Sequence, residues 1–176
     1  MPSKIFFAPI VGAIVGLLAG VAQAADPPPP KCTAAEQHQF DFWIGEWVVT
    51  DKGKLAGHSR IERILGGCAL LENWSGASGG GGKSLNFYDR DDGKWHQTWI
   101  DVGGDALFLS GTFEHGAMRL EGARRATDKQ PATRHRITWT RLPEGAVRQL
   151  WESSPADVER WEVQFDGRYA PAPVSN

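Results

Sequence analysis

The sequence has 176 residues, with 19 lysine and arginine residues against 21 aspartate and glutamate residues. This length falls within the roughly 100 to 200 residues usual for one domain. The basic residues are scattered, apart from the pair Arg124-Arg125. The composition therefore argues against nucleic acid as a partner, because binding a phosphate backbone requires clustered lysine and arginine.

The first residues predict export. Lys4 precedes an apolar run over 5–21, which ends in Ala22-Gln23-Ala24. This order predicts a signal peptide over 1–24, cleaved after the second alanine. The alternative is an uncleaved anchor, since the run approaches the roughly 20 residues that span a bilayer, but Pro9 and the small residues at its end argue against it. No second such run follows, so we expect a periplasmic or secreted protein with no stable membrane span after cleavage.

After the signal peptide we expect a stiff proline-rich tether over 25–31, one folded domain over 32–170, and a tail over 171–176. The chain has two cysteines, Cys32 and Cys68. Disulfides persist in exported proteins, so we expect the two to be bridged. Two buried free thiols are the alternative.

The folded part opens with a helix signal and continues with strand signals. Thr33-Ala34-Ala35-Glu36 has the spacing of a capping box, which predicts a short helix to about Phe42. Short alternating segments separated by glycine-rich and polar turns then predict strands near 46–51, 58–65, 68–75, 83–89, 94–101, 106–113, 117–122, 134–141, 146–152 and 159–166. This spacing is typical of an all-β sandwich or up-and-down barrel.

Alternation along these strands separates two faces. Trp95, Gln97, Trp99 and Asp101 share one face, which we predict to point inward. The same reasoning directs inward a second set, Ile137, Trp139, Val147, Gln149, Trp151, Trp161, Val163 and Phe165. A register slip of one residue is the alternative, and it would send inward His96, Thr98, Asn86 and Tyr88.

Gly45-Glu46-Trp47, at the head of the first strand, resembles the Gly-x-Trp signature of lipocalins and other calycin barrels. The chain more closely resembles exported bacterial proteins that share a lipocalin-like domain of unknown function, in the segments 40–47, 67–74, 94–101 and 147–152. The resemblance implies an antiparallel up-and-down barrel of about 8–10 strands with a short N-terminal helix. It also implies a structural role for Gly45 and Trp47, with Arg168 packing over the tryptophan by a cation-π contact. It brings no known activity.

A barrel rich in inward tryptophan, with a few inward polar groups, is suited to hold a small ligand. We therefore predict a binding site for a small apolar or aromatic molecule formed by Trp95, Gln97, Trp99, Asp101, Trp139, Gln149 and Trp151. Alternatively, the polar members bond one another or a buried water, and the tryptophans are packed core.

Two other function classes stay open. One is an enzyme, with Asp101, His96 and Glu152 as proton-transfer candidates, and the other is an envelope interaction protein whose barrel is fully packed. The sequence shows no nucleophile elbow, so we assign no catalytic residue. It identifies no metal site and leaves any cofactor unknown, because its five histidines stand on separate segments without the spacing of a zinc or haem motif: His38, His58, His96, His115 and His135.

Overall fold

The computed structural model describes residues 32–128 and 130–173. The expected signal peptide and proline-rich tether lie outside the described residues. Within the described ranges, no helix combines the length and the apolar character that a membrane crossing requires.

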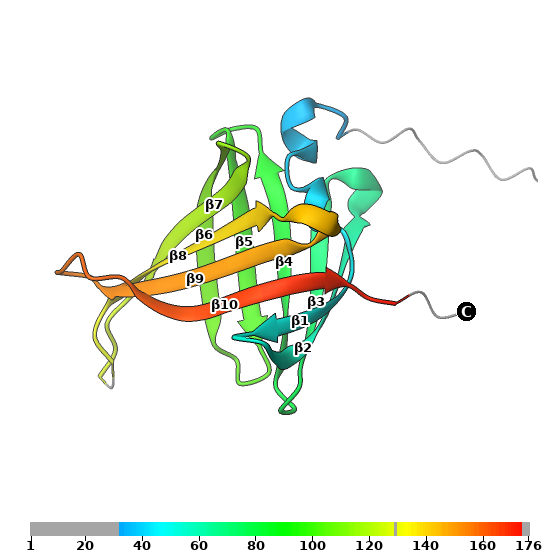
Figure 1. Ribbon diagram of the computed structural model, residues 1–176. Coiled ribbons are helices and arrows are strands. Elements are labelled where there is room, and N and C mark those ends of the chain that lie inside the picture. The colour runs from blue at the N-terminus through cyan, green and yellow to red at the C-terminus, as the bar shows by residue number, and fades with distance from the viewer. Residues whose placement is uncertain (1–31, 129, 174–176) are drawn as a thin grey trace, which may run out of the picture.

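Ten antiparallel strands form one closed barrel (Figure 1), which confirms the architecture that the resemblance implies and excludes the sandwich that the strand spacing also allowed. Their bounds are β1 (Gly45–Asp51), β2 (Lys54–Ile64), β3 (Ala69–Gly76), β4 (Gly81–Asp89), β5 (Lys94–Asp101), β6 (Ala106–Glu114), β7 (Ala117–Arg124), β8 (Thr133–Arg141), β9 (Val147–Pro155) and β10 (Glu162–Pro171). Each strand pairs with its neighbour in sequence, and β1 pairs with β10 to close the sheet. Closure leaves no free sheet edge.

The tightest hairpins have the turn chemistry that this topology requires. Lys52 and Gly53 join β1 to β2 with φ of 50° and 77°, and His115 and Gly116 join β6 to β7 with φ of 52° and 80°. Two consecutive positive φ values match the right-handed twist of the flanking strands, and glycine adopts them without steric cost.

One end of the barrel is covered by two 3-10 helices, η1 (Ala35–His38) and η2 (Asp41–Trp43) (Figure 1). They place the fully buried Phe40 and Trp43 inside the barrel. The Phe40 ring stacks on Trp43 at 4.9 Å between centroids and meets the edges of Trp95 at 5.5 Å and Trp139 at 5.1 Å. This aromatic cluster fills the capped end, whereas the opposite end, where β1, β3, β5, β7 and β9 terminate, is open.

The helical segment starts one residue later than the capping-box pattern predicts. Ala34 is the N-cap, and its N–H donates to the side-chain oxygen of Gln37 at 3.2 Å. Gln37 is buried whereas Glu36 is exposed, so the amide performs the role expected of the carboxylate. Where the sequence predicts one short helix to about Phe42, the structure has two 3-10 helices in succession, η1 and η2.

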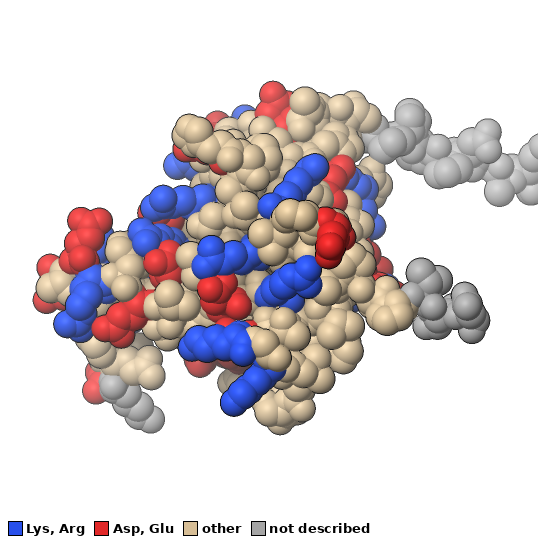
Figure 2. All heavy atoms as spheres, viewed as in Figure 1, with Lys and Arg blue, Asp and Glu red and all other residues tan. Residues whose placement is uncertain are grey.

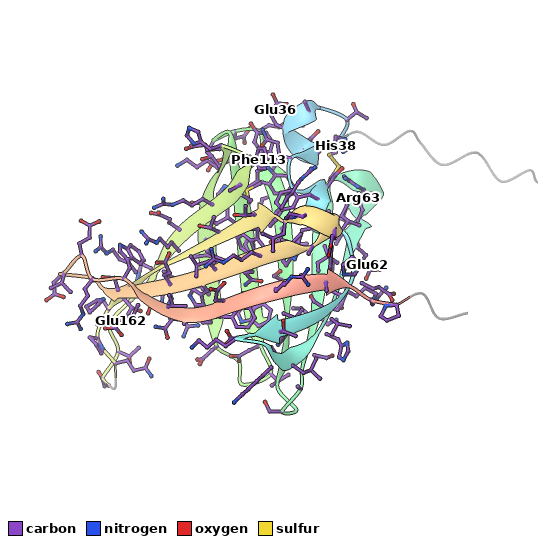
Figure 3. The ribbon with its side chains drawn as sticks, in the orientation of Figure 1. Glu36, His38, Glu62, Arg63, Phe113 and Glu162 are labelled. Carbon is purple, nitrogen blue, oxygen red and sulfur yellow. A yellow bond between two sulfur atoms is a disulfide. The ribbon has the colours of Figure 1, made fainter. Side chains whose placement is uncertain are left out.

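Covalent and ionic contacts hold the cap on the barrel. Cys32 and Cys68 form the expected disulfide, which joins the start of the cap to the end of η3 (Leu65–Gly67). Beside it, Asp41 of η2 pairs with His38 at 2.8 Å and with Arg63 of β2. Figure 3 shows His38 and Arg63 together at this end, next to the yellow sulfur bond. The cap is thus tied to β2 and β3.

Gly45 leaves room for the ring of Trp47, the tryptophan of the Gly-x-Trp signature. Its φ is 148°, and an added Cβ would lie 3.3 Å from the Trp47 ring. Trp47 is buried and donates its indole N–H to the carbonyl oxygen of Trp43 at 3.0 Å. The predicted packing of Arg168 over this ring is wrong, because Arg168 is exposed on the outer face of β10. Its neighbour Tyr169 faces inward and packs against Trp47 at 6.3 Å.

The beginning of β10 also differs from the prediction. The register of β10 against β9 shifts between Val163 and Phe165, so one extra residue restarts the alternation. Phe165 faces inward as predicted, but Val163 is 53% exposed. Trp161 lies outside the barrel, with the guanidinium of Arg136 4.1 Å from its ring centroid.

The outer face of the last strands is charged and mixed in sign. Arg136 of β8 pairs with Glu152 of β9 at 2.7 Å, and Arg148 of β9 pairs with Asp166 of β10 at 2.6 Å. Figure 2 shows basic and acidic side chains interspersed on this face.

Candidate functional site

The barrel interior is packed near the cap and hollow near the open end. The hollow is a cavity of about 290 Å³, close to the lower limit of roughly 300 Å³ for small-molecule sites. Its aromatic walls are Trp74, Trp99, Trp151 and Phe165, and its polar lining includes Glu72, Gln97, Asp101, Arg124, Gln149 and Tyr169. A wider hollow among the open-end turns shares Trp74, Trp99 and Phe165, so these rings stand between the cavity and solvent. The interior is therefore not fully packed.

Glycines on neighbouring positions make room for these three rings. An added Cβ would lie 2.9 Å from the Trp74 ring at Gly57, 2.4 Å from the Trp99 ring at Gly82, and 2.2 Å from the Phe165 ring at Gly167. Real Cβ atoms do not approach so closely, so each ring occupies the space of a missing side chain. The rings lie against the barrel wall as a result, and the space between them stays open.

A chain of hydrogen bonds leads to a buried carboxyl on the cavity lining. Gln97 donates its amide N–H to the Asn86 side-chain oxygen at 2.8 Å, and Asn86 donates to the Ser84 hydroxyl at 2.9 Å. Ser84 donates to Glu72 at 2.8 Å, and Ser59 donates to the other carboxyl oxygen at 3.1 Å. Four strands, β2 to β5, thus contribute to one polar network inside the barrel.

Burial raises the pKa of Glu72 from 4.5 to about 7, although the hydroxyl groups of Ser84 and Ser59 lower it in part. The side chain is only 4% exposed, and a carboxylate without water or a counter-ion is costly. Glu72 therefore changes its charge near neutral pH, which is unusual for a glutamate.

Tyr169 of β10 also lines the cavity, and its O–H donates to the side-chain oxygen of Gln149. Burial, followed by the nearby charge of Glu72, raises the pKa of Tyr169 well above its ordinary value. Tyr169 hence stays a neutral donor at physiological pH. The bond orients Gln149 at the cavity.

His135 near the open end is held neutral. Its Nδ1 accepts the indole N–H of Trp151 at 3.1 Å, and its Nε2 lies 2.9 Å from the Thr133 hydroxyl. Burial, and then the charge of Arg124, lower the pKa of His135. The histidine thereby positions Trp151 in the cavity wall.

The structure divides the seven predicted ligand-binding residues between two places. Gln97, Trp99, Asp101, Gln149 and Trp151 line the cavity. Trp95 and Trp139 lie in the aromatic core beneath the cap, where Phe40 covers them. Alternation identifies the inward face of a strand. It does not show at which positions along the barrel axis other side chains fill the interior. Ligand binding by the five cavity residues remains a prediction.

The three proton-transfer candidates are not brought together. His96 lies on the outer face, stacked on Phe87 at 5.4 Å and paired with Asp92 at 2.9 Å. Glu152 is also outside, where hydrogen bonds from Arg136 hold its pKa below the ordinary value. Asp101 lines the cavity mouth, but its Oδ1 accepts the backbone N–H groups of Gly103 at 2.8 Å and Asp105 at 3.0 Å. That aspartate shapes the β5–β6 turn.

The alternative register is wrong for β5, since Trp95 and Gln97 are buried and His96 faces outward. Asn86, by contrast, is fully buried in β4, directly opposite Gln97. Residues paired across two strands share a face, so an inward Gln97 requires an inward Asn86.

Glu72 is the main residue that sequence reasoning missed. The signal was present, because Glu72 stands between Leu70 and Trp74 on the same face of an alternating strand. A charged residue on an apolar face marks either a solvated end or a functional group. The sequence gives no comparable signal for Ser59 and Ser84, because small polar residues are common on both the inward and the outward face of a strand.

At the capped end, Asp89, Asp92 and His96 bring possible metal-ligand atoms within 4.8 Å of one another. Two carboxylate oxygens already accept backbone N–H groups of the β4–β5 turn, from Asp91 at 2.9 Å and Lys94 at 3.0 Å. The group stabilises this turn.

No protein-family model matches the sequence, and no curated protein matches it significantly. The barrel itself is consistent with a lipocalin-like fold.

Proposed function

We propose that the protein is an exported barrel that binds a small, largely apolar or aromatic molecule in the open-end cavity. The observation that carries this proposal is the unfilled space of about 290 Å³ between four aromatic rings and a set of polar groups. Binding sites typically combine apolar walls with a few placed polar groups. Gly82 and Gly167 support the proposal, because a Cβ at either position would first meet the Trp99 or Phe165 ring and push it into the space.

We further infer membership of the lipocalin-like exported bacterial proteins that the sequence resembles. Support comes from the Gly45-Glu46-Trp47 signature at the start of β1 and from the closed antiparallel barrel. A periplasmic or extracellular location is supported by the Cys32–Cys68 disulfide, which persists in oxidising compartments.

The test is native mass spectrometry of protein purified from its own periplasm, together with tryptophan-fluorescence titrations of fatty acids, aromatics, terpenoids and haem. We expect a retained small molecule, and an emission change on its addition, because Trp74, Trp99 and Trp151 line the cavity. An empty protein that responds to no member of this panel would contradict the proposal.

A further inference from the structure

The cavity holds one buried acid that has no partner of opposite charge. Glu72 is the only acidic side chain among the buried polar residues of the described chain, and no ion pair of those residues includes it. Its location on the cavity lining means that a bound molecule can reach it. Burial of an unpaired charge is costly unless something compensates for it.

The hydrogen-bond directions around Glu72 favour its charged form. Gln97, Asn86 and Ser84 each donate toward the carboxyl group, and Ser59 donates from the other side. Both oxygens are therefore acceptors, which is the pattern of a carboxylate. Each oxygen retains a second lone pair for another donor. Among the described residues nothing donates to the side-chain oxygen of Gln97, so the network offers a further acceptor.

The other charges of the cavity stand at its mouth, where β5 and β7 end. Asp101 is the last residue of β5, and Arg124 is the last residue of β7. The other polar side chains of the lining are neutral: the amides of Gln97, Gln149 and Gln164, and the hydroxyl of Tyr169, which donates to Gln149. With Glu72 ionised the lining has two acidic groups against one basic group, so its net charge is negative. The indole faces of Trp74, Trp99 and Trp151 add a preference for cations, because an aromatic face attracts positive charge.

We propose that the ligand carries a basic nitrogen, as an ammonium group on a small aromatic or aliphatic body, and that Glu72 binds this group. The ammonium donates to the carboxylate and to Gln97, while the apolar body occupies the space between the aromatic rings. The inference rests on the proposed function and specifies the chemistry of the ligand.

Three probes with the same phenyl group and similar size separate the ligand charges: 2-phenylethylamine, 2-phenylethanol and phenylacetate. Their dissociation constants are measured by calorimetry at pH 8 on the full chain and on Glu72→Gln, which keeps the shape of the side chain and removes its charge. Glu46→Gln serves as the matched control, since Glu46 is an exposed carboxyl on β1. We expect the wild type and the control to bind the amine at least tenfold more tightly than the alcohol, and the acid most weakly. In Glu72→Gln the preference for the amine should disappear.

The wild-type comparison stands by itself if the variant fails to fold. An amine that binds the wild type no better than the alcohol overturns the inference, even if the broad ligand panel is positive, and the proposed function then survives. A preference for the amine that persists in a folded Glu72→Gln also overturns it. Absence of binding by these probes and by the whole panel overturns both proposals.

Discussion

Glu72 is a single residue that links the stability of the fold to the chemistry of the cavity. Its pKa is about 7 in the folded chain and 4.5 for an ordinary glutamate, so the folded state holds its proton more tightly. The unfolding free energy therefore falls as the pH rises from about 4.5 to about 7. The stabilisation lost over this window is about 3 kcal/mol, at about 1.4 kcal/mol per pKa unit.

We expect Glu72→Gln to abolish this loss and to be more stable than the wild type at pH 8, with a smaller difference at pH 5. Urea denaturation at several pH values, followed by tryptophan emission, measures it. His135 acts with the opposite sign, because its pKa is lowered and its contribution is lost as the pH falls below 6.5. The contribution of His135 is the same in the wild type and in Glu72→Gln. The difference between their free energies of unfolding therefore reports on Glu72 alone. A wild type whose stability relative to Glu72→Gln does not depend on pH would contradict the assignment.

At the scale of elements, β9 and β10 form one wall of the cavity mouth, where Phe165 occupies the space above Gly167. In Gly167→Ala the three atoms nearest to the new Cβ would all belong to the Phe165 ring, the first at 2.2 Å, so the ring must move toward the cavity. We expect binding of the cognate ligand to weaken at least tenfold and stability to fall by about 1–3 kcal/mol. Gly80→Ala is the control, because nothing lies within 4 Å of its added Cβ. Equal affinities in the two variants would show that the ring does not limit the cavity.

The cap is the other element whose role can be isolated. The Cys32–Cys68 bridge spans 36 positions of the sequence and ties the cap to the barrel at the end away from the cavity. Replacing both cysteines with serine should cost about 4 kcal/mol on the chain-entropy argument. Ligand affinity should be unchanged in the folded fraction. Calorimetric unfolding and binding measured on the same preparation check both expectations, and a loss of affinity would mean that the cap shapes the cavity.

Over the whole molecule, the aromatic core lies at the capped end of the barrel and the cavity lies at the other end. Trp139 is fully buried beneath the cap, whereas Trp99 lies at the cavity mouth. We expect Trp139→Leu to destabilise the protein by about 3–5 kcal/mol with its affinity kept. Trp99→Leu should weaken binding with a smaller loss of stability. Denaturation midpoints and dissociation constants for the pair measure this division, and parallel losses in both variants would refute it.

The fold was predictable because strand alternation and turn chemistry are local signals. Each of the ten strands overlaps its predicted range, although β2 begins earlier, at Lys54, and β10 begins and ends later, over Glu162–Pro171. Cys32 pairs with Cys68, as expected. The errors occur where local rules are overridden. A one-residue bulge between Val163 and Phe165 reverses the facing of Val163, and alternation along β10 turns Arg168 away from Trp47.

The sequence by itself determined that this chain forms alternating strands and which face of them is apolar, because both follow from the geometry of a strand. The choice between a sandwich and a barrel was implied by the family resemblance, and the pairing of β1 with β10 decided it. Only the tertiary structure decided which inward residues surround empty space. Trp95 and Trp139 are covered because the cap inserts Phe40 between them, and Trp99 stays beside a cavity because Gly82 on the next strand leaves its ring room at the wall. The hydrogen bonds of Ser59 and Ser84 to Glu72 depend likewise on strand register, and barrel closure places Tyr169 on the lining of the same cavity.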